Sequence, residues 1–81
     1  MITVYSKSQC PNCVRAKDLL TRKGVSYVEI NIEADEEAKL FLVNNGFRSV
    51  PQINVDGVFL DGGLTGLAQQ GDEFFEAQKA N

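Results

Sequence analysis

The residues with the clearest chemical potential are Cys10 and Cys13, the two cysteines of the chain, which are separated by Pro11 and Asn12. Two thiols at this spacing can form a structural disulfide, supply part of a metal site, or exchange disulfides with a substrate. A structural disulfide here would close a very short loop and would remove little conformational entropy from the unfolded chain. A zinc site takes four ligands, whereas this sequence has two cysteines and no histidine, so we expect no metal. Thiol–disulfide exchange is the interpretation that the sequence favours.

This chemistry requires a cysteine that ionises readily, because the thiolate is the nucleophile. Apolar residues at helical spacing predict a helix over 11–23, and Pro11 suits its first position. Cys10 is then the N-cap, so the following amides and the helix dipole would stabilise its thiolate, and Lys7 adds a positive charge nearby. Cys13 lies one turn along the helix and is less exposed. We therefore expect Cys10 to attack and Cys13 to resolve.

The elements that must position this segment follow from the hydrophobic pattern. In chain order we expect a strand at 2–5, the helix at 11–23, a strand at 26–32, a helix from the acidic cluster at 33–37 to about 46, a hairpin at 52–60, a short helix starting near Thr65 and a last helix capped by Asp72. The acidic cluster complements a helix dipole, and we interpret it as structural. Asp56-Gly57 between two apolar runs is a strong hairpin signal. This order predicts an α/β fold with a parallel strand pair, a hairpin and helices on both faces of the sheet.

Length and composition restrict the possible functions. The 81 residues, 43% of them hydrophobic and 23% charged, are typical of one globular domain spanning 1–81. The formal charge of -3 and the scattered lysines and arginines argue against nucleic-acid binding. No leader pattern and no apolar run of membrane-spanning length is present, so we expect a cytoplasmic protein without membrane contact. We also expect a monomer.

The motifs, taken together, resemble those of the small dithiol glutaredoxins of bacteria and their phages. The resemblance runs almost from end to end and rests on Tyr5-Ser6-Lys7, Cys10-Pro11 with Cys13, Arg15-Ala16-Lys17, Lys23-Gly24-Val25, Val50-Pro51-Gln52-Ile53 and Gly62-Gly63. It implies a thioredoxin-like fold, in which a four-stranded mixed sheet is built from a βαβ unit followed by a β-hairpin and a C-terminal helix.

The resemblance also implies a glutathione-binding site. It implies that the Val50–Pro51 bond is cis and that the backbone of Val50 pairs with the cysteine of glutathione. Gly62 and Gly63, with the helix start that follows, would hold the γ-glutamyl end of the ligand. The glutathione-contacting residues implied in this way are Lys7, Asn12, Val50, Pro51, Gly63, Leu64 and Thr65, with Pro11 and Gly62 in support.

Two positions depart from the family pattern. Many glutaredoxins carry an acid after the glycine pair that contacts the amino group of glutathione, whereas this chain has Leu64-Thr65-Gly66. Thr65 can cap the helix and offer an oxygen, but it brings no negative charge. Asn12 stands where family members often have an aromatic residue.

The resemblance implies a thiol–disulfide oxidoreductase that takes glutathione as its reducing co-substrate and has no tightly bound cofactor. Its substrates would be protein disulfides and glutathione mixed disulfides, and ribonucleotide reductase is a partner by family analogy. One alternative is a glutaredoxin-like redoxin reduced by thioredoxin reductase, which the missing acid at Thr65 favours. Another is a dimer that binds an iron–sulfur cluster through Cys10 and glutathione, against which Pro11 argues.

Overall fold

The computed structural model describes residues 1–79, in which a four-stranded sheet is combined with four helices. In chain order the elements are β1 (Ile2–Ser6), α1 (Pro11–Arg22), β2 (Tyr27–Asn31), α2 (Glu36–Asn44), β3 (Gln52–Val55), β4 (Val58–Phe59), α3 (Gly63–Ala68) and α4 (Asp72–Lys79). The strand order in the sheet is β2-β1-β3-β4, with β1 parallel to β2 and the other pairs antiparallel. The predicted mixed sheet, with its βαβ unit and hairpin, is confirmed.

Strand β1 lies in the interior of the sheet, and its exit delivers the chain to the cysteine segment. It pairs on one side with β2, where Val4 lies opposite Glu29, and on the other with β3, where Val4 lies opposite Ile53. A strand with neighbours on both sides and helices on both faces is buried almost throughout, and in β1 even the polar Ser6 is buried. Residues 7–10 therefore begin at a fixed point of the fold.

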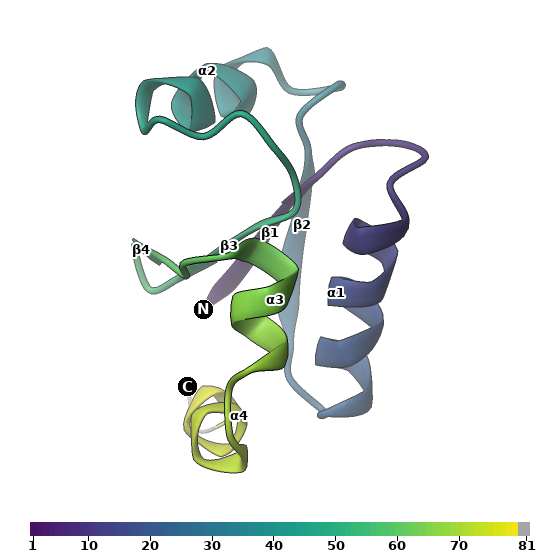
Figure 1. Ribbon diagram of the computed structural model, residues 1–81, viewed down its shortest axis with the longest axis vertical. Coiled ribbons are helices and arrows are strands. Elements are labelled where there is room, and N and C mark those ends of the chain that lie inside the picture. The colour runs from purple at the N-terminus through teal and green to yellow at the C-terminus, as the bar shows by residue number, and fades with distance from the viewer. Residues whose placement is uncertain (80–81) are drawn as a thin grey trace.

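Apolar side chains cover both faces of the sheet, and Figure 1 shows α1 and α2 on opposite sides of the strands. On the first face α1, α3 and α4 pack on the sheet. The buried residues there are Ile2, Val4, Ala16, Leu20, Val25, Ile53, Leu67 and Phe75. On the second face Ala38 and Leu42 of α2 pack against Tyr5, with Phe47 and Phe59 beside them. The prediction of helices on both faces is confirmed.

Helix α1 begins and ends as its sequence predicts. Cys10 is the N-cap, Pro11 occupies the first turn, and Gly24 follows the C-terminus with a φ of 73°. Cys13, Ala16 and Leu20 form its buried face. At 12 residues α1 is the longest helix, and within residues 1–79 no helix is long and apolar enough to cross a membrane.

Three helix starts differ from the predictions. Helix α2 begins at Glu36 with Asp35 as its N-cap, so Glu33, the first acid of the predicted cluster, lies before the helix. Helix α3 begins at Gly63, and its N-cap is Gly62, which has a left-handed φ of 84° and no side-chain capping bond. Thr65 is the third helical residue, so the prediction that it caps this helix is wrong. Asp72 lies inside the first turn of α4 rather than before it. The glycine pair turns the chain earlier than a threonine could, because only glycine adopts a left-handed φ without cost.

Candidate active site

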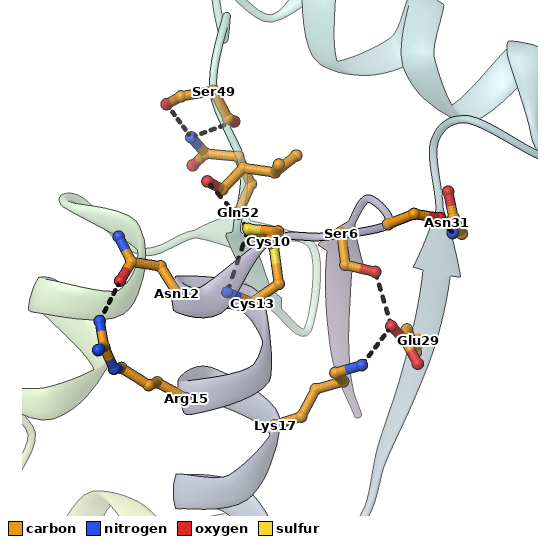
Figure 2. The surroundings of a disulfide bond; sticks show 12 residues. Ser6, Cys10, Asn12, Cys13, Arg15, Lys17, Glu29, Asn31, Ser49 and Gln52 are labelled. Carbon is orange, nitrogen blue, oxygen red and sulfur yellow. Dashed lines mark hydrogen bonds and ion pairs between the residues drawn. A yellow bond between two sulfur atoms is a disulfide. The ribbon is translucent and has the colours of Figure 1, made fainter.

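Cys10 and Cys13 are joined by a disulfide in the structure, at the start of α1 (Figure 2). Their Cα atoms are 5.2 Å apart, and the Cys13 amide donates a hydrogen bond to the Cys10 sulfur at 3.2 Å. Within residues 1–79, this is the one backbone amide recorded as donating to that sulfur. Cys10 is 8% exposed and Cys13 1% exposed, so the two sulfurs differ both in access and in hydrogen bonding. The predicted capping of α1 by Cys10 is confirmed.

The loop before β3 lies against Cys10. Its Val50–Pro51 peptide bond is cis, as the family resemblance implies, and the Val50 carbonyl oxygen is 4.0 Å from the Cys10 sulfur. The Gln52 side chain donates to the Ser49 carbonyl at 3.0 Å and so holds the loop closed (Figure 2). In the part of the chain that the structure describes, the Val50 amide has no hydrogen-bond partner. This backbone is free to pair with an extended ligand.

A groove of about 560 Å³ begins beside this loop and runs to the start of α3. Its lining residues are Asn12, Ser49, Val50, Pro51, Gln52, Gly62, Gly63, Leu64 and Thr65. The structure therefore brings together, in one groove, six of the seven residues expected to contact glutathione, and it places Gly62 with them. Ser49 and Gln52 also line the groove and were missed from sequence, although they flank the Val-Pro pair.

The glycine pair allows the two walls of this groove to approach each other closely. A Cβ atom on Gly63 would lie 2.5 Å from the Pro51 carbonyl oxygen, and Gly63 also has a φ of 53°. A Cβ on Gly66 would lie 1.8 Å from the Asp61 carbonyl oxygen. Real Cβ atoms do not come this near to backbone oxygens, so these positions of α3 require glycine. The pair is thus more than a plain turn into a helix.

Comparison with known proteins decides the family. The family model for glutaredoxin matches residues 2–60. The chain belongs to the glutaredoxin family. It is 44% identical to a probable glutaredoxin of Synechocystis over 75% of this chain and 72% of that one. It is 36% identical to glutaredoxin 1 of Rickettsia prowazekii over 99% of this chain and 92% of that one.

The fold agrees with a solved structure as well. The glutaredoxin-like NrdH-redoxin of Escherichia coli, described by its authors as having a thioredoxin-like activity profile, superimposes with a TM-score of 0.75 at 24% identity, over 86% of this chain and 93% of that one. The thioredoxin-like fold is therefore confirmed. As a glutaredoxin, the protein is a thiol–disulfide oxidoreductase with a redox-active cysteine pair.

Lys7 lies apart from the groove of this glutaredoxin. It is exposed and lines a second pocket together with Cys10 and Cys13. It also lines a cavity of about 270 Å³ with Lys39, Arg48 and Val50. Lys7 is therefore close to the cysteine segment, as predicted, but it does not line the groove that contains Asn12 and Gly63.

The groove of this glutaredoxin carries no carboxylate among the lining residues that the structure describes. Asn12 at its rim accepts a hydrogen bond at 2.9 Å from Arg15, which brings a positive charge close by (Figure 2). Residues 1–79 contain no group of three or more histidine, cysteine, aspartate or glutamate side chains placed to hold a metal ion. The site has the chemistry of a dithiol beside a polar groove.

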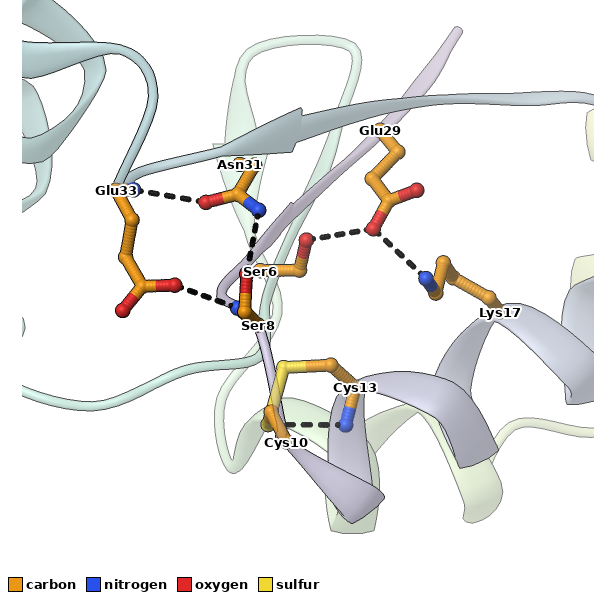
Figure 3. A network of polar contacts seen from close by, with 8 residues as sticks. All are labelled: Ser6, Ser8, Cys10, Cys13, Lys17, Glu29, Asn31 and Glu33. Atoms are coloured by element: carbon orange, nitrogen blue, oxygen red, sulfur yellow. Dashed lines mark hydrogen bonds and ion pairs between the residues drawn. A yellow bond between two sulfur atoms is a disulfide. The ribbon is translucent and has the colours of Figure 1, made fainter.

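A network of polar contacts, which sequence reasoning missed, lies beside the cysteine segment (Figure 3). Glu29 accepts hydrogen bonds from Ser6 and Lys17, both at 2.7 Å, and these lower the pKa of its carboxyl group, Lys17 having the larger effect. Glu33 accepts one from the Ser8 amide at 2.7 Å, which lowers the pKa of Glu33. Glu33 thus holds the loop before Cys10, whereas the sequence placed it in the acidic cluster at a helix start.

Proposed function

We propose that this glutaredoxin uses glutathione to reduce protein disulfides and glutathione mixed disulfides, with Cys10 as nucleophile and Cys13 as resolving cysteine. The observation that carries the proposal is the groove beside Cys10, in which Asn12, the loop 49–52 and the segment 62–65 are neighbours. Glutaredoxins use glutathione as a substrate, and this groove lies where an extended tripeptide could reach the Cys10 sulfur.

The two cysteines differ in ways that suit these roles. The Cys10 sulfur already accepts a hydrogen bond from the Cys13 amide, and it lies at the positive end of the helix dipole. Both interactions stabilise a thiolate. The Cys13 sulfur is almost fully buried and lies one turn inside α1. Burial in apolar surroundings disfavours a thiolate, so Cys13 reacts only once a mixed disulfide has formed within its reach.

The proposed cycle balances electrons through four disulfide exchanges. The Cys10 thiolate attacks a substrate disulfide, one substrate thiolate leaves, and the other half stays on Cys10 as a mixed disulfide. Cys13 loses its proton and attacks the Cys10 sulfur, so the second substrate thiolate leaves and the Cys10–Cys13 disulfide forms. Two glutathione molecules then reduce this disulfide in successive exchanges and become glutathione disulfide.

The backbone of Val50 would fix the position of glutathione relative to Cys10. Its amide has no partner within residues 1–79, and its carbonyl oxygen lies 4.0 Å from the Cys10 sulfur. An extended peptide that pairs with this amide and carbonyl adds a short strand and brings its own cysteine next to Cys10. The γ-glutamyl end would then lie toward the start of α3, where the amides of Gly63 and Leu64 have no acceptor within residues 1–79.

By family analogy we also propose ribonucleotide reductase as one recipient of the electrons, and the cytoplasm as the place of the reaction. A reducing compartment keeps such a dithiol available between turnovers.

Reduction by thioredoxin reductase is the second candidate, and one observation favours it. The groove lining has no carboxylate in the described residues, so the amino group of glutathione would meet no negative charge there. Without an acid to pair with that amino group, free glutathione would bind more weakly, whereas attack by a reductase on Cys10, the more accessible of the two cysteines, would be unaffected.

The electron-donor assay separates the two candidates. The oxidised protein is given NADPH with glutathione and glutathione reductase, and separately NADPH with thioredoxin reductase, and NADPH oxidation is followed with a disulfide substrate present. The Cys10→Ser variant sets the background in both systems. We expect turnover in the glutathione system; turnover only with thioredoxin reductase would contradict the proposal.

A further inference from the structure

A second pocket, of about 500 Å³, opens on the side of the cysteine pair that faces away from the groove. It shares no lining residue with the groove, and both cysteines line it. Its charged lining residues are Lys7, Lys17 and Glu29. Lys7 is exposed at its mouth, whereas Lys17 and Glu29 are joined by an ion pair at 2.7 Å. This ion pair is the one fixed charge pair in the wall of the pocket.

Lys17 is placed to act on Cys13. The two residues are four positions apart in α1, so they lie on the same helix face, one turn from each other. The Lys17 side chain is only 27% exposed, because Glu29 of β2 holds its ammonium group against the sheet. A positive charge in this place stabilises a Cys13 thiolate that burial otherwise disfavours.

Glu29 has the opposite effect. It is fixed by the buried Ser6 hydroxyl as well as by Lys17, and both bonds favour its charged form. Its carboxylate therefore neutralises Lys17 at the wall of the pocket, and a negative charge there opposes ionisation of a neighbouring thiol. Figure 3 shows the three side chains on the same side of the disulfide, with Ser6 between Glu29 and the sulfurs.

We propose that Lys17 and Glu29 are positioning residues that set the rate of the resolving step, Lys17 by favouring the Cys13 thiolate and Glu29 by opposing it. The balance between them fixes how long a substrate stays joined to Cys10 before Cys13 releases it. This inference rests on the proposed roles of the two cysteines, but it does not depend on glutathione.

The resolving step can be observed directly with an aromatic disulfide, dithiobis(nitrobenzoic acid). The reduced protein is mixed with one equivalent. Cys10 attacks, one coloured thiolate leaves, and a mixed disulfide remains on Cys10. Cys13 then loses its proton to solvent and attacks the Cys10 sulfur, and the second coloured thiolate leaves as the Cys10–Cys13 disulfide forms. The second release is a unimolecular phase, and its rate is the rate of resolution.

We expect Lys17→Met to slow the second phase and Glu29→Gln to accelerate it, each by about three- to tenfold near neutral pH, because a single nearby charge shifts a thiol ionisation by a fraction of a unit or more. The double variant should return close to the wild-type rate. The pH at which the second phase reaches half its maximal rate should rise in Lys17→Met and fall in Glu29→Gln.

Matched controls are Arg22→Met and Asp18→Asn, which remove the same charges from an exposed ion pair on the same helix. Neither should alter the second phase. Far-ultraviolet circular dichroism and the rate of the first phase report whether each variant is folded. Opposite shifts in the two variants, absent from the controls, support the proposal; shifts in the same direction, no shifts, or equal shifts in the controls overturn it.

The same traces separate this inference from the proposed cysteine roles. If Cys10→Ser keeps the fast first release and Cys13→Ser loses it, the roles are reversed and both proposals fail. If the fast release requires Cys10 but Lys17→Met and Glu29→Gln leave the rate of the second phase unchanged, the cysteine roles stand and only the inference about Lys17 and Glu29 fails.

Discussion

Gly63 shows most clearly how one residue shapes the site. Its backbone is left-handed, and its missing Cβ leaves room for the Pro51 carbonyl oxygen, so α3 can start beside the Val50–Pro51 loop. Any side chain here would push the loop and the helix apart. The groove between them would then change its shape.

We therefore predict that Gly63→Ala lowers the free energy of unfolding by about 2–4 kcal/mol, which combines left-handed strain with overpacking. Urea denaturation measures this loss. Gly46→Ala is the matched control, because Gly46 also has a positive φ, 84°, but a Cβ there meets nothing within 4 Å. Gly46→Ala should lose about 1–2 kcal/mol from strain alone. An equal loss in both variants would show that the contact with Pro51 contributes nothing.

For single residues, sequence reasoning succeeded where neighbouring residues or a family motif indicate the role. The N-cap role of Cys10 follows from Pro11 beside it, and the groove positions of Val50 and Gly63 follow from family motifs. It missed Glu29, because the partners of Glu29 come from β1 and α1, far away in the sequence. A contact between residues so far apart in the sequence produces no local sequence pattern.

At the scale of elements, the Lys17–Glu29 pair joins α1 to β2 next to the cysteines. Its strength depends on the charge of Glu29. The hydrogen bond from Lys17, followed by that from Ser6, lowers the pKa of Glu29 from its ordinary value of 4.5. A group whose pKa is lowered by folding stabilises the fold above its unfolded pKa, and this contribution is lost as the pH falls through the folded pKa.

We predict that the oxidised wild-type protein is more stable than Glu29→Gln above pH 4.5, and that this advantage declines below pH 4.5 and vanishes at lower pH. The difference should be under about 1 kcal/mol, since Glu29 is partly exposed and solvent screens the pair. Urea denaturation at a series of pH values measures it. Glu76→Gln, which breaks an ion pair within α4, is the control. If Glu29→Gln is instead more stable than the wild type, by a margin that grows as the pH rises, the stabilising role of the Glu29 carboxylate is contradicted.

The elements themselves were largely predictable. β1, α1 and the hairpin lie within a residue or two of their expected bounds, because caps, Gly24 and Asp56-Gly57 mark their ends locally, whereas α2 begins three residues after the first acid of its cluster. The start of α3 was misplaced because the chain turns at Gly62 and Gly63, both left-handed, and Gly63 lies directly against the Pro51 carbonyl. That constraint comes from tertiary packing, and in the sequence only the two glycines indicate it.

At the scale of the whole molecule, the cysteine pair lies where three parts of the chain meet. β1 delivers the segment, α1 begins with it, and the loop before β3 covers it, while α3 forms the far wall of the groove. Figure 1 shows α1 and α3 next to each other, with the loop from α2 descending toward β3. The family motifs are scattered along the sequence because each part of the site comes from a different element.

In the proposed glutathione-dependent reaction, Cys10 attacks and Cys13 resolves. The most direct measurement is the release of glutathione from a glutathionylated peptide, with glutathione as the reductant, by the wild type, Cys10→Ser and Cys13→Ser. A glutathione mixed disulfide can be reduced by Cys10 alone, because free glutathione can itself reduce the intermediate on Cys10.

We predict that Cys10→Ser abolishes the release and that Cys13→Ser keeps it within a few-fold of the wild type. For a protein disulfide substrate, Cys13→Ser should be strongly impaired, because the resolving thiol is then required. If Cys13→Ser abolishes release of glutathione from the peptide as completely as Cys10→Ser does, the assigned roles are contradicted.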